Sequence, residues 1–289
     1  MDKKYTINSL KLDSKVSNNF SHVELSVLIF PVFILTLICV YFFFFNKESF
    51  IDGYINIQKD LFFYLNEKLF NFPNLQHNLT QLGDVLIFFP LVAVFFIYAP
   101  KLWEALLASA LISLLVCAVF KKLFAMPRPA AIFNNEDFFI IGQTLKGKSS
   151  LPSGHSVSTF IVIAIVLFAF MPKNTIHKMV WSFFILLVGL IIALSRVGVG
   201  AHYPLDVLIG SIIGFVIVVI GINVTNKINW LSCIKNLKLF PLFIVLFIIW
   251  DILIVIKIAN ENLPIYYISV AALTITVTLM TRIYVKTKN

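Results

Sequence analysis

The chain alternates between long apolar stretches and short polar connections. In a bilayer the backbone must satisfy its own hydrogen bonds, so each stretch is predicted to be a helix despite its many β-branched and aromatic residues. Several stretches are shorter than the roughly twenty residues of a full span, so their helices must extend into neighbouring semi-polar residues. The eight stretches are residues 25–45, 85–99, 105–120, 157–171, 179–194, 205–222, 239–256 and 265–283. This pattern predicts an all-α integral membrane protein.

Composition supports the membrane assignment and excludes other classes of protein. The chain is 60% hydrophobic and 13% charged, and it contains 30 phenylalanines, more apolar side chain than a water-soluble core can bury. Its formal net charge is +9, but the lysines lie between apolar stretches and form no basic run, so no nucleic-acid partner is expected. Cys39, Cys117 and Cys233 lie in or beside apolar stretches without paired spacing, which indicates neither a disulfide framework nor a thiolate metal site.

The positions of the cations predict an orientation in the membrane. The first apolar stretch follows a polar segment, residues 1–24, and is too long for the apolar region of a signal peptide, so it is expected to be an uncleaved anchor. If this segment is cytoplasmic, more than half of the lysines and arginines fall on the cytoplasmic side. Both termini are therefore expected in the cytoplasm.

The longest connection, residues 46–84, is predicted to contain an amphipathic helix along the outer membrane surface. Two uses are open: a lid or lipid-entry ramp, or a solvated connector that rests on the headgroups. Its apolar positions at helical spacing are Phe50, Tyr54, Ile57, Leu61, Phe62, Leu65 and Leu69, against charged Asp52, Lys59, Asp60, Glu67 and Lys68.

The first cluster of candidate site residues follows the third apolar stretch. Lys121 ends that stretch, and Arg128 lies between Pro127 and Pro129, which prevent a helix from continuing. Arg128 can hold two oxygens with its planar guanidinium, and Lys121 adds a point charge. The pair suits an anionic group, although two cations alone are also typical of a headgroup region.

The second cluster begins the fourth stretch with Ser153, Gly154 and His155. Ser153 can cap the helix, and Gly154 allows an anion to approach the backbone N–H groups of the first turn. His155 beside a bound phosphate can donate a proton to a departing oxygen. A lone histidine at a helix start is more often structural.

The third cluster is the most specific and contains Ser195, Arg196, His202 and Asp206. Pro204 fits the first helical position of the sixth stretch, which puts Asp206 in the first turn, close to His202. The carboxylate can hold one ring nitrogen protonated and leave the other free to attack phosphorus. Arg196 adds a cation against the charge of the transition state.

All three clusters lie in outside segments of the predicted topology. The positions of the apolar stretches follow from hydropathy alone, so the location of all three clusters on one side of the membrane is an independent observation. We therefore expect three separate loops to meet above the bilayer and form a cationic cup around His202.

With these motifs in this order, the chain resembles the type 2 phosphatidic acid phosphatase (PAP2) superfamily. Its three-part signature also occurs in vanadium-dependent haloperoxidases and some bacterial acid phosphatases. The match in each motif is complete, and the resemblance covers roughly residues 25–224. It implies a PAP2-type core of six transmembrane helices, to which residues 225–289 add two C-terminal transmembrane helices.

The resemblance also implies a role for each matched position. His202 attacks phosphorus, Asp206 orients it, and His155 protonates the leaving group and later activates water. The phosphoryl oxygens are held by Lys121, Arg128, Ser153, Gly154 and Arg196. No metal or other cofactor is implied, and the sequence contains no carboxylate cluster or His-x-x-x-His pair that suggests a divalent site.

The expected function is a metal-independent lipid phosphate or diphosphate phosphatase at the outer face of a bacterial inner membrane. Its expected partners are the lipid substrate and the bilayer. Candidate substrates are undecaprenyl diphosphate, phosphatidylglycerol phosphate, phosphatidic acid and lipid A phosphates, and the motifs choose neither among them nor an oligomeric state. Three alternatives stay open: a lipid-to-lipid phosphotransferase, a membrane protein that only binds or transports an anionic lipid, and a haloperoxidase.

Three further polar residues stand at the edges of the apolar stretches. Asp84 opens the second stretch and is expected to cap its helix. Asp251 lies within the seventh stretch and is expected to reach the interface, or to pair with Lys257 if the helix bends. His77 is expected to be solvated.

Overall fold

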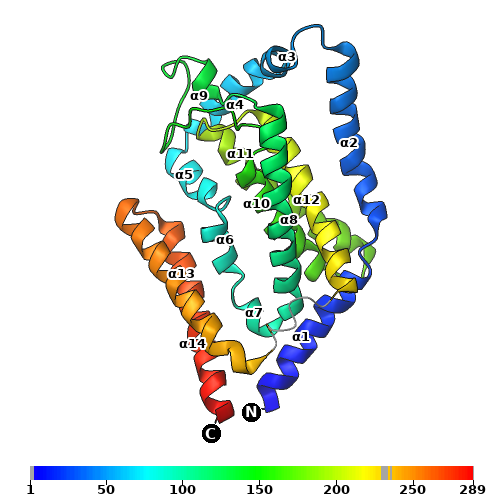
Figure 1. Ribbon diagram of the computed structural model, residues 1–289, viewed down its shortest axis with the longest axis vertical. Coiled ribbons are helices and arrows are strands. Elements are labelled where there is room, and N and C mark those ends of the chain that lie inside the picture. The colour runs from blue at the N-terminus through cyan, green and yellow to red at the C-terminus, as the bar shows by residue number, and fades with distance from the viewer. Residues whose placement is uncertain (1–2, 229–233, 235, 289) are drawn as a thin grey trace.

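The computed structural model describes residues 3–228, 234 and 236–288, and in these residues it contains helices and no strands (Figure 1). The all-α prediction is confirmed, and Cys233 falls outside the described part. Within the described part of the chain, six helical segments are long and apolar enough to cross a membrane: Leu25–Phe45, Pro100–Ile132, Thr175–Gly198, Pro204–Lys227, Leu237–Asn260 and Pro264–Lys286. The chain is therefore a multi-pass membrane protein.

The predicted count of eight spanning helices is not confirmed, because two apolar stretches do not form long helices. Residues 85–99 form two short helices, α6 (Val85–Leu91) and α7 (Phe95–Tyr98). Pro90 lies inside α6 and has no backbone N–H to donate to the Leu86 carbonyl, so it weakens this short helix. The fourth stretch forms α10 (Gly154–Ala169), whose 16 residues are fewer than a full span needs.

The short α10 is enclosed by protein and does not need to match the thickness of the bilayer by itself. It packs against α8 (Pro100–Phe124), α11 (Thr175–Gly198) and α12 (Pro204–Lys227), and most of its side chains are buried. Two glycines of α12 allow a close approach to α10. A Cβ at Gly214 would lie 2.5 Å from the Val157 carbonyl oxygen, and one at Gly210 would lie 2.7 Å from that of Ser153. This contact brings the second and third clusters together.

The N-terminal polar segment contains a helix that its sequence did not predict. It forms α1 (Lys3–Ser21), which packs across the ends of α7, α8 and α10. Val16 and Phe20 of α1 are fully buried in the main core. The first apolar stretch follows as η1 (Leu25–Leu28), α2 (Ile29–Val40) and η2 (Tyr41–Phe45), which stand at the side of the bundle (Figure 1).

Residues 46–84 form three short helices where the sequence predicted one amphipathic helix. They are α3 (Phe50–Asn56), α4 (Lys59–Phe70) and α5 (Pro73–Gln81). The apolar face of this segment packs on protein: Tyr54 and Phe62 are buried in a second core cluster with Met126, Leu151 and Tyr203. This packing argues against the alternative of a solvated connector that only rests on the headgroups.

The C-terminal residues form a helical hairpin beside α6. After η4 (Leu237–Leu239), it consists of α13 (Phe240–Asn260) and α14 (Pro264–Lys288). The Trp250 Nε1 donates to the Leu86 carbonyl at 2.8 Å, and the Ser269 hydroxyl donates to the Ile87 carbonyl at 2.9 Å. The helix α14 also contacts α5, and the turn of the hairpin lies beside α5 (Figure 1).

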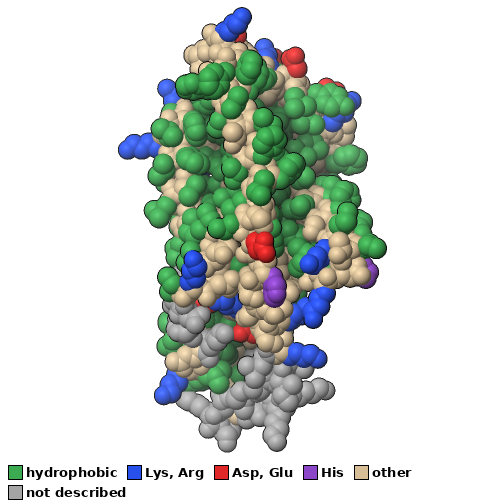
Figure 2. All heavy atoms as spheres, turned by 90° about the vertical axis from the view of Figure 1, so that its right-hand side faces the viewer, with side chains coloured by type: hydrophobic (Ala, Val, Ile, Leu, Met, Phe, Trp, Pro, Cys, Tyr) green, Lys and Arg blue, Asp and Glu red, His purple; other side chains and the backbone are tan. Residues whose placement is uncertain are grey.

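The exposed surface agrees with a membrane environment. In the view of Figure 2, hydrophobic side chains cover the broad middle of the face, and lysines and arginines lie near its upper end and in its lower part. Large apolar side chains such as Phe43, Leu115 and Phe183 are more than half exposed. A contiguous apolar surface of this extent requires lipid or protein to cover it.

Candidate active site

The first and third sequence clusters meet at His202, which is only 1% exposed. An Nη1 atom of Arg128 lies 3.2 Å from His202 Nε2, and it also donates to the Ala201 carbonyl at 3.2 Å. On the other side of the ring, Nδ1 lies 3.5 Å from Asp206 Oδ2 and 3.4 Å from the Ser150 hydroxyl. A guanidinium has no acceptor, so Nε2 must offer its lone pair, and the ring proton belongs on Nδ1.

The start of α12 positions the acid as the sequence predicted. Pro204 occupies the first turn of the helix, where its missing N–H costs nothing, and Asp206 lies in the same turn. The Asp206 carboxylate accepts a hydrogen bond from the Tyr203 backbone N–H at 3.0 Å. This N-terminal cap holds the carboxylate one helical turn from His202.

Two further residues, which the sequence analysis missed, bind the same carboxylate. The Tyr54 hydroxyl donates to Asp206 Oδ1 at 2.8 Å, and the Ser150 hydroxyl donates to Oδ2 at 2.5 Å. Burial and then the Asp206 charge raise the pKa of Tyr54 well above its ordinary value, so the phenol stays protonated and donates. No spacing in the sequence marks either residue, because both meet Asp206 only through the tertiary fold.

The second cluster joins the site through the start of α10. Ser153 caps this helix, since its hydroxyl accepts from the Ser156 N–H at 3.3 Å, as the sequence predicted. Its own N–H donates to the Asp206 carbonyl at 3.1 Å, which fastens α10 to α12. A Cβ at Gly154 would lie 3.4 Å from the Lys121 ammonium, so Lys121 of α8 reaches the first turn of α10.

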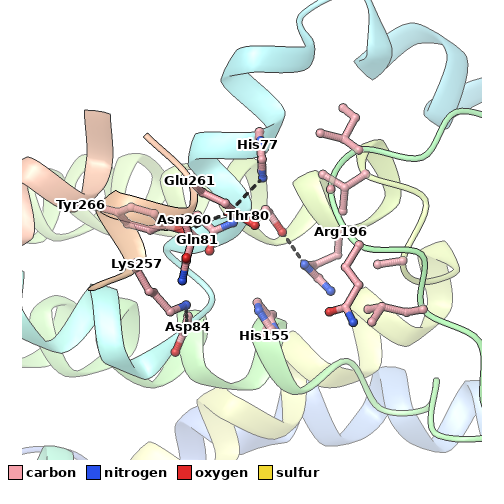
Figure 3. A pocket seen from close by; sticks show the side chains of 16 residues that line it. His77, Thr80, Gln81, Asp84, His155, Arg196, Lys257, Asn260, Glu261 and Tyr266 are labelled. Carbon is pink, nitrogen blue, oxygen red and sulfur yellow. Dashed lines mark hydrogen bonds and ion pairs between the residues drawn. The ribbon is translucent and has the colours of Figure 1, made fainter. Parts of the chain in front are cut away.

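His155 and Arg196 lie side by side at the inner end of a cavity of about 400 Å³ (Figure 3). His155 packs against Gly83, where a Cβ would approach the His155 Cβ to 2.5 Å. Arg196 is 7% exposed and donates to the Thr80 hydroxyl. Its Nε is buried and has no hydrogen-bond partner among the described residues, so one donor remains for a ligand.

Charge at the site is concentrated around His202. Burial, followed by the charges of Arg128, Arg196 and Lys121, holds the pKa of His202 well below its ordinary value. The imidazole is therefore neutral at physiological pH, which is the state required of a nitrogen nucleophile. Three cations converge on this space, and Asp206 lies behind the ring, so the open side attracts anions.

The eight residues to which the resemblance assigns a role are thus grouped around α8, α10, α11 and α12. In the described ranges 3–228, 234 and 236–288, no group of three or more His, Cys, Asp or Glu side chains is placed to hold a metal ion. The arrangement can bind a phosphoryl group against a buried, neutral imidazole.

The fold and the site define a multi-pass membrane protein in which cationic side chains surround one buried histidine. Residues 101–230 match the family model of the PAP2 superfamily, and this segment contains all three clusters. This match confirms, over residues 101–230, the resemblance to the PAP2 superfamily that the motifs predicted.

One solved structure similar to this chain is titled "Crystal structure of Aquifex aeolicus LpxE". It is 23% identical over an alignment that covers 58% of this chain and 95% of that one, with a TM-score of 0.48. Among curated proteins, none matches the sequence.

Proposed function

We propose that this protein is a membrane lipid phosphatase that forms a phosphohistidine on His202. The observation that carries the proposal is the contact of 3.2 Å between the Arg128 guanidinium and Nε2 of the buried His202. That contact places a phosphate-binding group next to the lone pair that would attack phosphorus. The PAP2 match over residues 101–230 and the apolar helices support a phosphatase that acts on a lipid.

In the first half of the reaction, His202 Nε2 attacks phosphorus and the bond between phosphorus and the leaving oxygen breaks. Arg128, Lys121 and Arg196 neutralise the charge on the phosphoryl oxygens, and the first turn of α10 offers backbone N–H groups. His155 gives its proton to the leaving alkoxide or phosphate. The positive charge that forms on the His202 ring is stabilised by Asp206.

In the second half, a water molecule attacks phosphorus from the side that the leaving group has vacated. His155, now unprotonated, accepts a proton from that water, the bond between phosphorus and nitrogen breaks, and phosphate leaves. His202 returns to its neutral form with the proton on Nδ1. No step requires a metal ion, because cationic side chains supply the positive charge.

We further propose that residues 25–224 form the catalytic membrane domain and that the site faces the outer side of a bacterial inner membrane, with both termini cytoplasmic. The two termini lie at one end of the molecule and α3, α4 and α9 (Pro129–Ile132) at the other (Figure 1). This separation supports the orientation inferred from the positions of the cations.

The proposed function is tested by phosphate release from the purified full-length protein in detergent. The panel consists of undecaprenyl diphosphate, phosphatidylglycerol phosphate, phosphatidic acid and a lipid A phosphate. We expect release of free inorganic phosphate from at least one of them. If labelled phosphate instead moves to an added lipid acceptor, the enzyme is a phosphotransferase, and if no lipid loses phosphate, the proposal fails.

Activity is expected to persist in excess chelator and to be inhibited by vanadate. Cationic side chains replace a metal in the proposed mechanism, and vanadate in its five-coordinate form resembles the transition state and can bond to a histidine nitrogen. The measurement is the rate of phosphate release after treatment with EDTA, and separately across a vanadate titration. Strict dependence on added magnesium would contradict the mechanism.

A further inference from the structure

The cavity that begins at His155 and Arg196 extends away from the phosphoryl site and ends on the C-terminal hairpin. Its outer wall includes Lys257, Asn260 and Glu261, at the end of α13 and in the turn before α14 (Figure 3). These residues lie outside the segment 101–230 that matches the PAP2 superfamily. The part of the chain that the family match does not explain therefore forms a wall of the active-site cavity.

The outer part of this cavity is balanced in charge, unlike its inner end. Lys257 forms an ion pair with Asp84 at 2.7 Å, and His77 Nε2 lies 3.5 Å from Glu261 Oε2 (Figure 3). Glu261 also accepts from the buried Tyr266 hydroxyl at 3.2 Å. Each carboxylate faces its own positive or ionisable partner, so little positive charge is left to attract a second phosphate.

The remaining polar groups of the wall suit hydroxyl groups. The amides of Gln81, Gln143 and Asn260 line the cavity, and each offers both a donor and an acceptor. At the inner end, the buried Nε of Arg196 has no partner among the residues described and provides a further donor. Amides suit the hydroxyls of a sugar or polyol, because both kinds of group can donate and accept hydrogen bonds.

The leaving group must lie on this side of the phosphoryl site. His155 is the proposed proton donor to the leaving oxygen and it lines this cavity, so whatever is attached to that oxygen enters the same space. We propose that the C-terminal hairpin builds a headgroup subsite and that the substrate is a lipid whose phosphate is esterified to a sugar or polyol with free hydroxyls. This inference rests on the proposed phosphatase function and makes a diphosphate lipid a poor substrate.

The first test compares four substrates with the full-length protein in detergent. They are phosphatidylglycerol phosphate, a glycolipid with phosphate on its sugar, phosphatidic acid and undecaprenyl diphosphate. We expect kcat/KM for one of the first two to exceed that for each of the last two by about tenfold or more, the effect of one or two additional hydrogen bonds. The ratio between the first two shows whether the subsite prefers a polyol or a sugar.

Two variants then test whether residues of the subsite cause this substrate preference. Gln81→Met removes a donor and an acceptor at similar volume and is expected to lower kcat/KM about tenfold for the hydroxylated substrate only. Glu261→Gln removes a negative charge and is expected to shift the preference towards the diphosphate. Asp251→Asn is the matched control, because Asp251 lies on the same hairpin as Glu261, accepts from the Thr274 hydroxyl at 3.0 Å and does not line the cavity.

The outcomes separate the two proposals. If the protein releases phosphate but prefers the diphosphate or phosphatidic acid, or if both variants affect all four substrates equally, the subsite proposal is overturned and the phosphatase proposal stands. If none of the four lipids loses phosphate, the phosphatase proposal fails and the subsite proposal with it. Inhibition by inorganic phosphate should be unchanged in both variants, which shows that the phosphoryl site is intact.

Discussion

Replacing His202 with alanine is expected to reduce phosphate release by a factor of about 10⁴ or more, the usual effect of removing a nucleophile. The alanine leaves the three cations in place, so binding of the lipid phosphate should persist. In a rapid-quench experiment with labelled substrate, wild-type protein should carry acid-labile, alkali-stable phosphate, and the variant should carry none. The His202→Ala variant is thus expected to bind the lipid without releasing phosphate from it.

The matched control is His177→Ala. His177 lies in the first turn of α11, at the opposite end of that helix from Arg196, and is exposed. This variant should retain wild-type activity. If His202→Ala kept more than a tenth of the activity, or if the label were found on another residue, the covalent mechanism would be wrong. Lipid binding without turnover in the wild-type protein would instead favour a binding or transport role.

Replacing Asp206 with asparagine is expected to lower kcat on the order of 10³-fold while the protein still folds. The amide oxygen can take the place of Oδ2 and accept from Ser150 and the Tyr203 N–H, and the amide nitrogen can donate to the Tyr54 oxygen. The shape of the network is retained, but no negative charge remains to stabilise the ring of His202 when it becomes positive. The measurement is kcat and KM on the best lipid of the panel.

Tyr54→Phe completes this series. It removes one of the three donors to Asp206 but keeps the charge, so we expect a loss of only about tenfold in kcat, the effect of one hydrogen bond to a charged group. Tyr64→Phe, at an exposed position of α4, is the control and should have no effect. A Tyr54→Phe variant as impaired as Asp206→Asn would show that the tyrosine acts on the substrate and not through the carboxylate.

The sequence was informative about the helices where a long apolar run faces lipid, and less so elsewhere. Hydropathy does not show whether a helix is surrounded by lipid or protein, so the enclosed 16-residue α10 was counted as a full span. The stretch 85–99 was also counted, although Pro90 interrupts its hydrogen bonding. The helix α1 was not predicted, because its buried residues Val16 and Phe20 are few among many polar ones.

The site residues also divide into those that the sequence predicts and those that only the fold reveals. Lysine, arginine, histidine and aspartate near prolines at helix ends carry recognisable chemistry, so the three clusters were found from the sequence alone. The expected cap at Asp84 was also found, since its side chain accepts from the Leu86 N–H. Tyr54 and Ser150 lie 152 and 56 residues from Asp206, and their residue types are common, so only the fold reveals them.

His77 was expected to be solvated, but it lines the cavity and faces Glu261.

The hydrogen bond between Tyr54 and Asp206 constrains how a lipid can arrive. Tyr54 belongs to the segment in front of the site, and Asn66 of the same segment donates to three backbone carbonyls, those of Phe139, Val197 and Gly198. An outward movement of this segment would remove the Tyr54 hydrogen bond from the buried Asp206 carboxylate, at a cost of about 1–3 kcal/mol. It would also break the hydrogen bonds of Asn66. Outward movement of this segment is therefore unfavourable, and α3 and α4 are expected to stay in place as a wall of the site when a substrate binds.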